Sequence, residues 1–180
     1  MKEVLIQSIG FIGVIFYIAS YQVKSNKRLY IYQLLGSLSF MVQFLLLGGI
    51  TGCFGLMITI LRNFLLARSD RWTWVRGKAA AAAIIALSTA VTVYTWDSWL
   101  NLLPWLAVVG STLGYWTNNA RTIRLSNLIC ASPCWLLYDI LLGSIGGVVN
   151  EAITLCSILI SIYRYGWKAL ADNQFGDSKE

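Results

Sequence analysis

Three residues that could bind a solute or hold a proton lie close together in the last third of the chain. Asp139 lies near the end of one apolar stretch, and Asn150 and Glu151 follow the pair Gly146-Gly147 at the start of the next. Two carboxyl groups that face one another can share one proton, and ionisable groups in apolar segments usually face a bundle interior. The pattern predicts a polar pocket or proton site. The competing interpretation is that both carboxylates reach an aqueous surface and stay solvated.

Other polar and aromatic residues could complete such a pocket. Gln43 lies deep in an apolar stretch, where a glutamine either contacts a ligand or forms a hydrogen bond across a helix interface. Trp135 could stack on a sugar or a base, with packing as the alternative. The predicted pocket residues are Asp139, Asn150, Glu151, Gln43, Trp135 and Tyr138.

Arg62 is the one cation that lies well inside an apolar stretch, five residues before that stretch ends. It could pair with a carboxylate or with an anionic substrate. Its long stem also allows the guanidinium to reach the surface of a bilayer while the stem stays in hydrocarbon. We favour this second interpretation.

The sequence argues against catalysis. It has no histidine, and no serine in a nucleophile-elbow motif. The cysteines lie in apolar stretches and are expected to pack rather than to bind metal. Tyr138-Asp139 is similar to the tyrosine-aspartate pair of intramembrane aspartyl proteases, but their second motif, Gly-x-Gly-Asp, is absent. We therefore expect no enzyme activity, no metal and no cofactor. The four cysteines are Cys53, Cys130, Cys134 and Cys156.

The elements that must position these residues are seven long apolar stretches. The chain is 57% hydrophobic and only 12% charged, against roughly 25% charged in a soluble domain. The stretches do not alternate polar and apolar residues as a membrane barrel would. The predicted fold is an all-α membrane protein with seven transmembrane helices. The stretches are 4–21, 29–47, 50–67, 79–96, 99–117, 125–142 and 146–165.

The positive charges give an orientation to these seven crossings. Thirteen of the fourteen lysines and arginines fall on one side, and Lys2 is the exception. Lys/Arg excess in short loops marks the cytoplasmic side, so the N-terminus is predicted outside and the C-terminus in the cytoplasm. The net charge of +6 is spread over every basic loop, which indicates phospholipid rather than nucleic acid as the partner.

The chain carries a weak internal repeat. Residues 46–52 read Leu-Leu-Gly-Gly-Ile-Thr-Gly, and 95 residues later 141–147 read Leu-Leu-Gly-Ser-Ile-Gly-Gly. Each segment predicts a tight glycine turn between two helices. The repeat predicts two parallel three-helix units joined by one extra helix. This is a recognised plan for transporters, with a site between the halves. The predicted units are 4–67 and 99–166 for the repeats, 68–98 for the basic loop and linker helix, and 167–180 for a polar cytoplasmic tail.

This 3+1+3 layout resembles the SWEET, semiSWEET and PQ-loop superfamily, and within it the YgjV family of bacterial inner-membrane proteins. The stretch Trp135-Leu-Leu-Tyr138-Asp139, the glycine turn and then Asn150 are similar to the third-helix pattern of SWEET units. The resemblance implies that Asn150 lines a solute pocket. It also implies a multi-pass protein of a bacterial inner membrane.

We therefore expect a SWEET-like transporter of an unidentified small solute. The alternative is a non-transporting membrane protein of the same fold that binds a partner or cargo. The oligomeric state stays open, with a homo-oligomer among the alternatives. A transport assay in proteoliposomes, with and without a pH gradient, would separate the two functions. Loss of uptake in Asp139→Asn or Glu151→Gln would support the pocket.

Overall fold

The computed structural model describes residues 2–22, 26–117 and 119–172 of the 180-residue chain. Some residues used in the charge argument have side chains outside the described part, and the predicted tail 167–180 lies mostly outside it. These charged residues are Lys24, Lys27, Arg164, Lys168 and Lys179.

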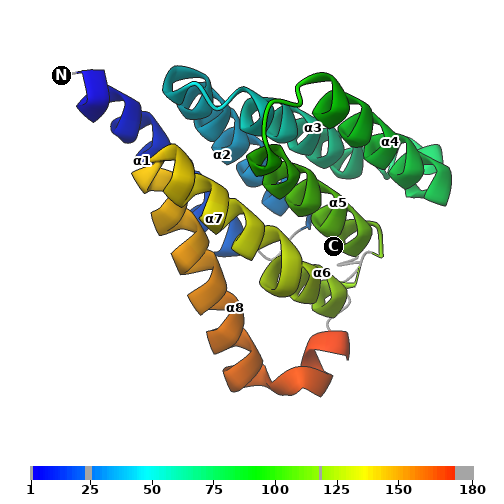
Figure 1. The fold of residues 1–180 in the computed structure, drawn as a ribbon. Helices are drawn as coiled ribbons and strands as arrows, with labels where there is room; N and C mark the ends of the chain where they lie inside the picture. The colour runs from blue at the N-terminus through cyan, green and yellow to red at the C-terminus, as the bar shows by residue number, and fades with distance from the viewer. Residues whose placement is uncertain (1, 23–25, 118, 173–180) are drawn as a thin grey trace.

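Within the described ranges the chain consists of helices and the turns that join them (Figure 1). The all-helical prediction is therefore confirmed. The π-helical segment Asn127–Ala131 joins α6 and α7 into one continuous helix, and two 3-10 turns cover Thr73–Arg76 and Trp99–Asn101. The helices are α1 (Lys2–Gln22), α2 (Asn26–Leu47), α3 (Ile50–Ala67), α4 (Lys78–Tyr94), α5 (Leu102–Trp116), α6 (Ala120–Ser126), α7 (Ser132–Leu142) and α8 (Ile145–Asp172).

The sixth helix begins earlier than the predicted stretch at residue 125. Asn119 caps it, because its side chain accepts hydrogen bonds from the backbone N–H groups of Arg121 and Thr122. Such a cap satisfies N–H groups that have no partner inside the helix. Arg121 and Arg124 therefore lie on the first turns of a helix rather than in a loop.

Four segments of the described chain are long and apolar enough to cross a membrane: Lys2–Ser20, Tyr30–Leu47, Ile50–Ala67 and Arg121–Leu142. Two further apolar helices, Lys78–Tyr94 and Ile145–Ile160, are shorter. A span needs about 20 apolar residues, with a range of roughly 17–25. These four segments thus have the length and composition of membrane helices.

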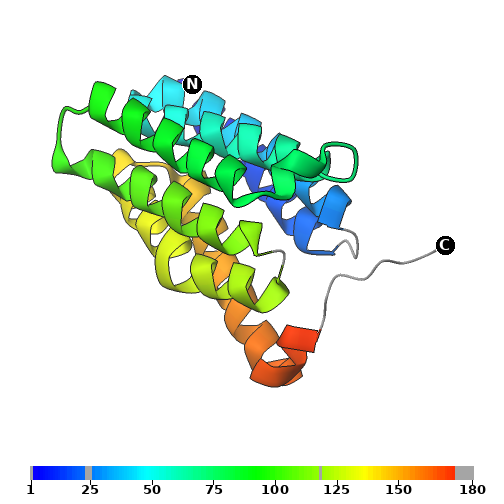
Figure 2. The ribbon, with the colours of Figure 1, turned by 90° about the vertical axis from the view of Figure 1, so that its right-hand side faces the viewer.

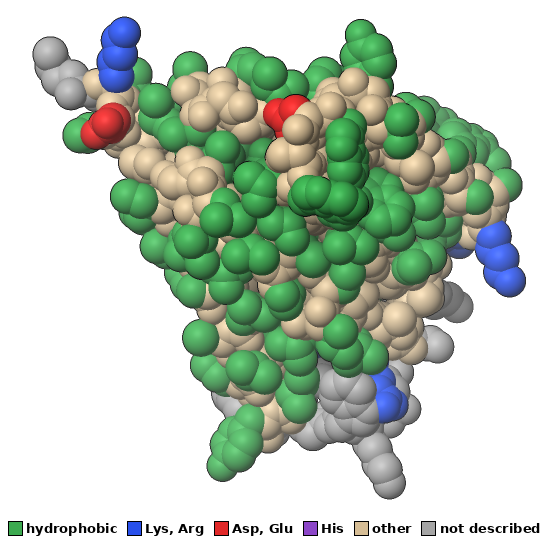
Figure 3. All heavy atoms as spheres, in the orientation of Figure 1, with side chains coloured by type: hydrophobic (Ala, Val, Ile, Leu, Met, Phe, Trp, Pro, Cys, Tyr) green, Lys and Arg blue, Asp and Glu red, His purple; other side chains and the backbone are tan. Residues whose placement is uncertain are grey.

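The surface of the bundle is apolar and its interior is mixed. Ile15 is 66% exposed, Met57 51% and Ile140 56%. Figure 3 shows one face covered by hydrophobic side chains, with charged ones near its edges. Buried polar side chains include Gln33 and Asn63. An apolar exterior around buried polar groups indicates that hydrocarbon rather than water surrounds these helices.

Six helical columns form a closed ring, here called the helix ring. The pairs of columns in contact around the ring are α1–α2, α2–α3, α3–α5, α5 with α6 and α7, α7–α8, and finally α8–α1. Helix α4 packs outside the helix ring, against α5 and α3. Figures 1 and 2 show α4 at the edge of the bundle, beside α5. The ring leaves an interior that polar side chains from every column can reach.

Two glycine turns connect helices of the ring at one end of the bundle. Gly48 and Gly143 have φ values of 81° and 76°, the left-handed region that glycine adopts without strain. In each turn the next residue donates its backbone N–H to the carbonyl five residues back, Gly49 to Phe44 and Ser144 to Asp139, as in a Schellman motif. The predicted turns are confirmed.

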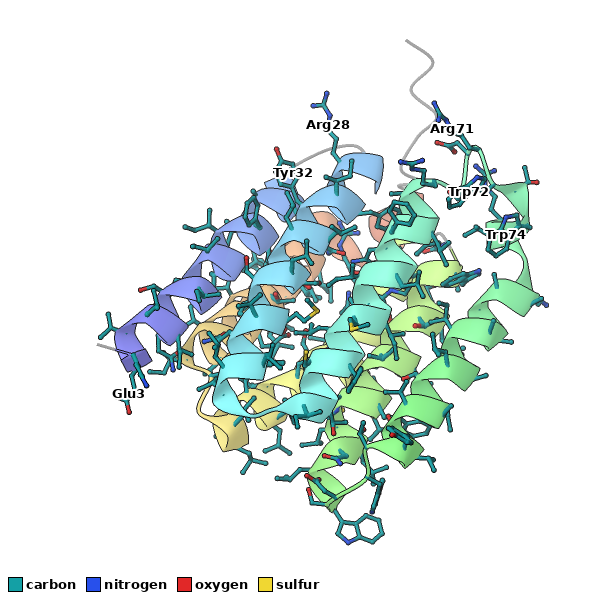
Figure 4. All side chains as sticks on the ribbon, turned by 90° about the horizontal axis from the view of Figure 1, so that it is seen from above. Glu3, Arg28, Tyr32, Arg71, Trp72 and Trp74 are labelled. Carbon is teal, nitrogen blue, oxygen red and sulfur yellow. The ribbon has the colours of Figure 1, made fainter. Side chains whose placement is uncertain are left out.

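The two turns lie against one another. A Cβ atom on Gly49 would lie 2.6 Å from Leu142 Cδ2, at the end of α7. Helices α3 and α8 therefore begin at the same end of the bundle. Figure 4 shows Arg28, Arg71 and Trp72 at the opposite end, while Glu3 lies at the N-terminal end of α1.

A glycine-to-glycine contact closes the helix ring between α1 and α8. A Cβ atom on Gly146 would lie 2.9 Å from the carbonyl carbon and 3.0 Å from the Cα atom of Gly10. Backbone atoms cannot rotate out of the way as a side chain can. Small residues of this kind let membrane helices approach closely.

Candidate functional site

A cavity of about 70 Å³ lies within the helix ring. Its lining comes from α1, α2, α3, α5, the π-helical segment, α7 and α8, while α4 contributes none of the lining residues among those described. A water needs about 10–15 Å³ of such volume. The cavity therefore has room for several waters.

Two carboxyl groups form one end of the cavity. Asp139 is 2% exposed, and its carboxyl group rests directly against Gly147, where a Cβ atom would collide with it. Glu151 lies one turn further along the same face of α8 and lines the same cavity. The structure thus directs both inward rather than to an aqueous surface.

Two neutral side chains form hydrogen bonds with the Glu151 carboxylate. Asn150 donates a hydrogen bond from Nδ2 to Glu151 Oε1 at 3.1 Å, and Ser132 forms a second side-chain hydrogen bond with the same carboxylate. Asn150 and Ser132 both line the cavity and are almost fully buried. Asp139 Oδ1 has no hydrogen-bond partner among the described residues. This end can accept hydrogen bonds from a polar solute.

The remaining predicted pocket residues divide into two groups. Trp135 lines the cavity and packs against Phe44, with ring centroids 6.0 Å apart. Tyr138 does not line the cavity. Its hydroxyl accepts a hydrogen bond from the backbone N–H of Gly52 at 3.1 Å, so it connects α7 to the start of α3.

Gln43 also lies outside the cavity lining, in a polar network near the glycine turns. It donates to Gln7 Oε1 at 3.0 Å and accepts from Ser144 Oγ at 3.1 Å. Gln7 donates to the carbonyl oxygen of Gly143 and accepts from the backbone N–H of Ile145. This network, Gln7–Gln43–Ser144, connects α1, α2 and the α7–α8 turn, and it closes that end of the helix ring.

Arg62 lies on the opposite side of the cavity, and the prediction that it reaches the bilayer surface is wrong. Its side chain is buried, with 3% of the residue exposed, and it lines the cavity. Nη1 donates to Ser111 Oγ at 2.6 Å, and the guanidinium carbon lies 4.4 Å from the centre of the Tyr115 ring. Helix α5 supplies both partners. The direction of Arg62 depends on the packing of α3 against α5, for which the sequence offers no signal.

A second polar layer lies beyond Arg62, toward the end with Arg28 and Arg71. Tyr115 donates to Gln33 Oε1 at 3.1 Å, which connects α5 to α2. Around it, Tyr30, Leu66 and Val75 form a buried apolar cluster with Tyr115. The cavity therefore lies between two closed layers, the Gln7–Gln43–Ser144 network and this tyrosine layer.

Four pairs of cavity-lining positions are separated by 95 residues, the spacing of the glycine turns. Each pair has one member in the first three helices and one in the last three. The pairs are Phe40 and Trp135, Phe44 and Asp139, Leu56 and Glu151, and Thr59 and Thr154. The two sets share positions but differ in chemistry, because the acids belong to the second set alone.

An apolar helical bundle with a polar interior defines an integral membrane protein, and this class fits the comparison with known families. A family described as "Bacterial inner membrane protein", Imp-YgjV, matches residues 4–168. The chain belongs to this family of inner-membrane proteins. Comparison with curated proteins and with solved structures found no match.

Proposed function

We propose that this protein is a multi-pass transporter that moves a small polar solute through the central cavity. In this proposal residues 4–67 and 99–166 form two parallel three-helix units, and α4 is the linker that makes them parallel. Seven crossings place the N-terminus outside. The single observation that carries the proposal is the cavity itself, lined by residues of both units and at four pairs of positions 95 residues apart.

The glycine turns support the parallel arrangement. Both have the same left-handed glycine and the same hydrogen bond across five residues. They lie at one end of the bundle, as parallel units require. Parallel repeats about an axis normal to the membrane are a recognised plan for transporters, with the substrate at their interface.

The two closed layers support alternating access. The Gln7–Gln43–Ser144 network would open toward one side of the membrane, and the layer of Tyr115 and Gln33 toward the other. Each layer depends on few hydrogen bonds, and a hydrogen bond between membrane helices contributes only about 0.6–2 kcal/mol. Opening either layer therefore breaks few hydrogen bonds, together with the apolar contacts of Tyr115 in the second layer.

The basic end of the bundle supports the orientation. Arg28, Arg71 and Trp72 lie together at the end opposite the glycine turns (Figure 4). Lys/Arg excess belongs on the cytoplasmic side, and tryptophans gather at the membrane interface. The glycine turns and the acidic end of the cavity would then face the periplasm.

Thiols introduced at cavity positions test this proposal without a known substrate. In a variant without the four native cysteines, Thr59→Cys and Thr154→Cys are each treated with 2-sulfonatoethyl methanethiosulfonate, which does not cross membranes. Spheroplasts and inverted vesicles offer the two sides. A transporter that opens alternately is expected to react at each position from both sides.

The matched control is Met57→Cys, on the same helix as Thr59 but 51% exposed on the apolar exterior. It is expected to react from neither side, because a thiol in hydrocarbon does not ionise. Reaction of both cavity thiols from one side only, or from neither side, would contradict transport. That result would favour a membrane protein of the same fold that binds a partner without moving a solute.

A further inference from the structure

We infer that the central cavity binds a solute that carries an oxyanion, a carboxylate or phosphate group, and that Arg62 is the group that holds it. The inference rests on the proposed function and adds the substrate class to it. Arg62 lies twelve residues after the start of α3, about 18 Å along the helix at 1.5 Å per residue. It lies nearer the opposite end of α3, five residues before Ala67, but its side chain is 3% exposed and is directed into the bundle.

Neutral groups alone surround Arg62 among the described residues. Its Nε donates to Asn63 Oδ1 at 3.2 Å, and its Nη1 donates to Ser111 Oγ. The ion pair found in the described part of the chain joins Arg76 and Asp70, which are exposed. A buried cation without a carboxylate is costly, and such residues in membranes usually mark a substrate path.

The guanidinium is held in a fixed plane before any ligand arrives. Ser111 is itself fixed, because its hydroxyl donates to the carbonyl of Ala107 at 2.7 Å. Tyr115 lies beneath the guanidinium and is held by its hydrogen bond to Gln33. Arginine has five N–H donors in a planar fork, and the bonds to Asn63 and Ser111 leave donors for a ligand. A fixed fork of this kind matches carboxylate and phosphate oxygens.

The cavity has opposite chemistry at its two ends. Glu151 lies six residues into α8, and α3 and α8 begin at the same end of the bundle. Arg62 and Glu151 therefore differ in depth by about six residues, or roughly 9 Å. A solute that fits both ends places its oxyanion at Arg62 and a hydroxyl or amino group near Glu151 and Asp139. The expected substrate is a small hydroxy acid, amino acid or sugar phosphate rather than a neutral sugar.

A charge-selective reaction at one thiol tests this inference. Thr59 is one turn before Arg62 on α3 and lines the same cavity. In the cysteine-free background, Thr59→Cys is treated with the anionic sulfonatoethyl reagent and with its cationic trimethylammonium counterpart. Each rate is divided by the rate of that reagent with a free thiol. The anionic reagent is expected to react at least ten times faster.

Variants at Arg62 assign the preference to this side chain. Arg62→Gln is expected to remove the preference, and Arg62→Lys, which keeps the charge, to retain most of it. Equal rates with both reagents in the parent protein, or a preference that survives Arg62→Gln, would overturn the inference while leaving transport intact. Failure of both reagents to reach the thiol from either side would instead overturn the proposed function.

A competition experiment decides the case in which Arg62→Gln does not fold. With Arg62 in place, sodium acetate or inorganic phosphate is expected to slow the anionic reagent at Thr59→Cys at least fivefold, relative to sodium chloride of equal ionic strength. Slowing by acetate indicates a carboxylate, and slowing by phosphate indicates a phosphate ester. Absence of protection by either anion would overturn the inference.

Discussion

Replacement of Gly146 by valine is expected to lower the free energy of unfolding by about 3 kcal/mol, because overpacking at a tight contact cannot be relieved. The added side chain would meet the backbone of Gly10, with the Cβ atom 2.9 Å from its carbonyl carbon. Helices α1 and α8 would have to separate, and the helix ring would open. For a chain of this length the apparent melting temperature of the purified protein should fall by roughly 6–12 °C.

The neighbouring residue provides a matched control. Ile145→Val also produces valine, but Ile145 is 56% exposed on the apolar exterior. Its effect should lie within about 0.5 kcal/mol, as for most surface substitutions. Equal melting temperatures for Gly146→Val and Ile145→Val would show that α1 and α8 are not in contact, and that the cavity is open to lipid along that seam.

Asp139→Leu is expected to make the protein more stable. The side chain is 2% exposed, and its Oδ1 has no hydrogen-bond partner among the described residues. A buried polar atom without a partner costs about 1–3 kcal/mol, and leucine has the same branching at Cγ. The position 95 residues earlier, Phe44, is already apolar and packs well. Thermal unfolding of the purified protein should show a gain of about 1–3 kcal/mol.

The isosteric change Asp139→Asn separates the effect of side-chain shape from the effect of side-chain polarity. It keeps a buried polar group, so its stability should change less than that of Asp139→Leu. A gain from leucine would indicate that Asp139 is kept for function at the expense of stability. A clear loss from leucine would contradict this account, since it would show that the packing of the Asp139 carboxyl group against Gly147 is a structural requirement.

The parts of the fold that depend on neighbouring residues alone were predictable from the sequence. Apolar length predicts the helices, and the repeated glycines predict the turns at Gly48 and Gly143, because few other residues adopt a left-handed backbone. The π-helical segment Asn127–Ala131 was not predicted. The segment lies within a continuous helix, and it contains no proline or glycine that would indicate an irregularity.

The candidate site was less predictable from the sequence, because the direction of each side chain depends on packing between distant segments. Asp139 and Glu151 lie near a turn that the sequence reveals, so their proximity could be anticipated. Arg62 lies near the end of its helix, where both a surface and an interior position suit a long side chain. Its partners on α5 are 49 and 53 residues away in the sequence, and only the closed helix ring brings them together.

In the proposed arrangement the polypeptide crosses the bilayer an odd number of times, so that its two triplets of helices point the same way. Single cysteines placed at either terminus and treated with a membrane-impermeant maleimide test it directly. The amino-terminal thiol should react in intact spheroplasts, and the carboxyl-terminal thiol only after permeabilisation. Reaction of both thiols in the same compartment would contradict the parallel arrangement, and with it the transport cavity built on it.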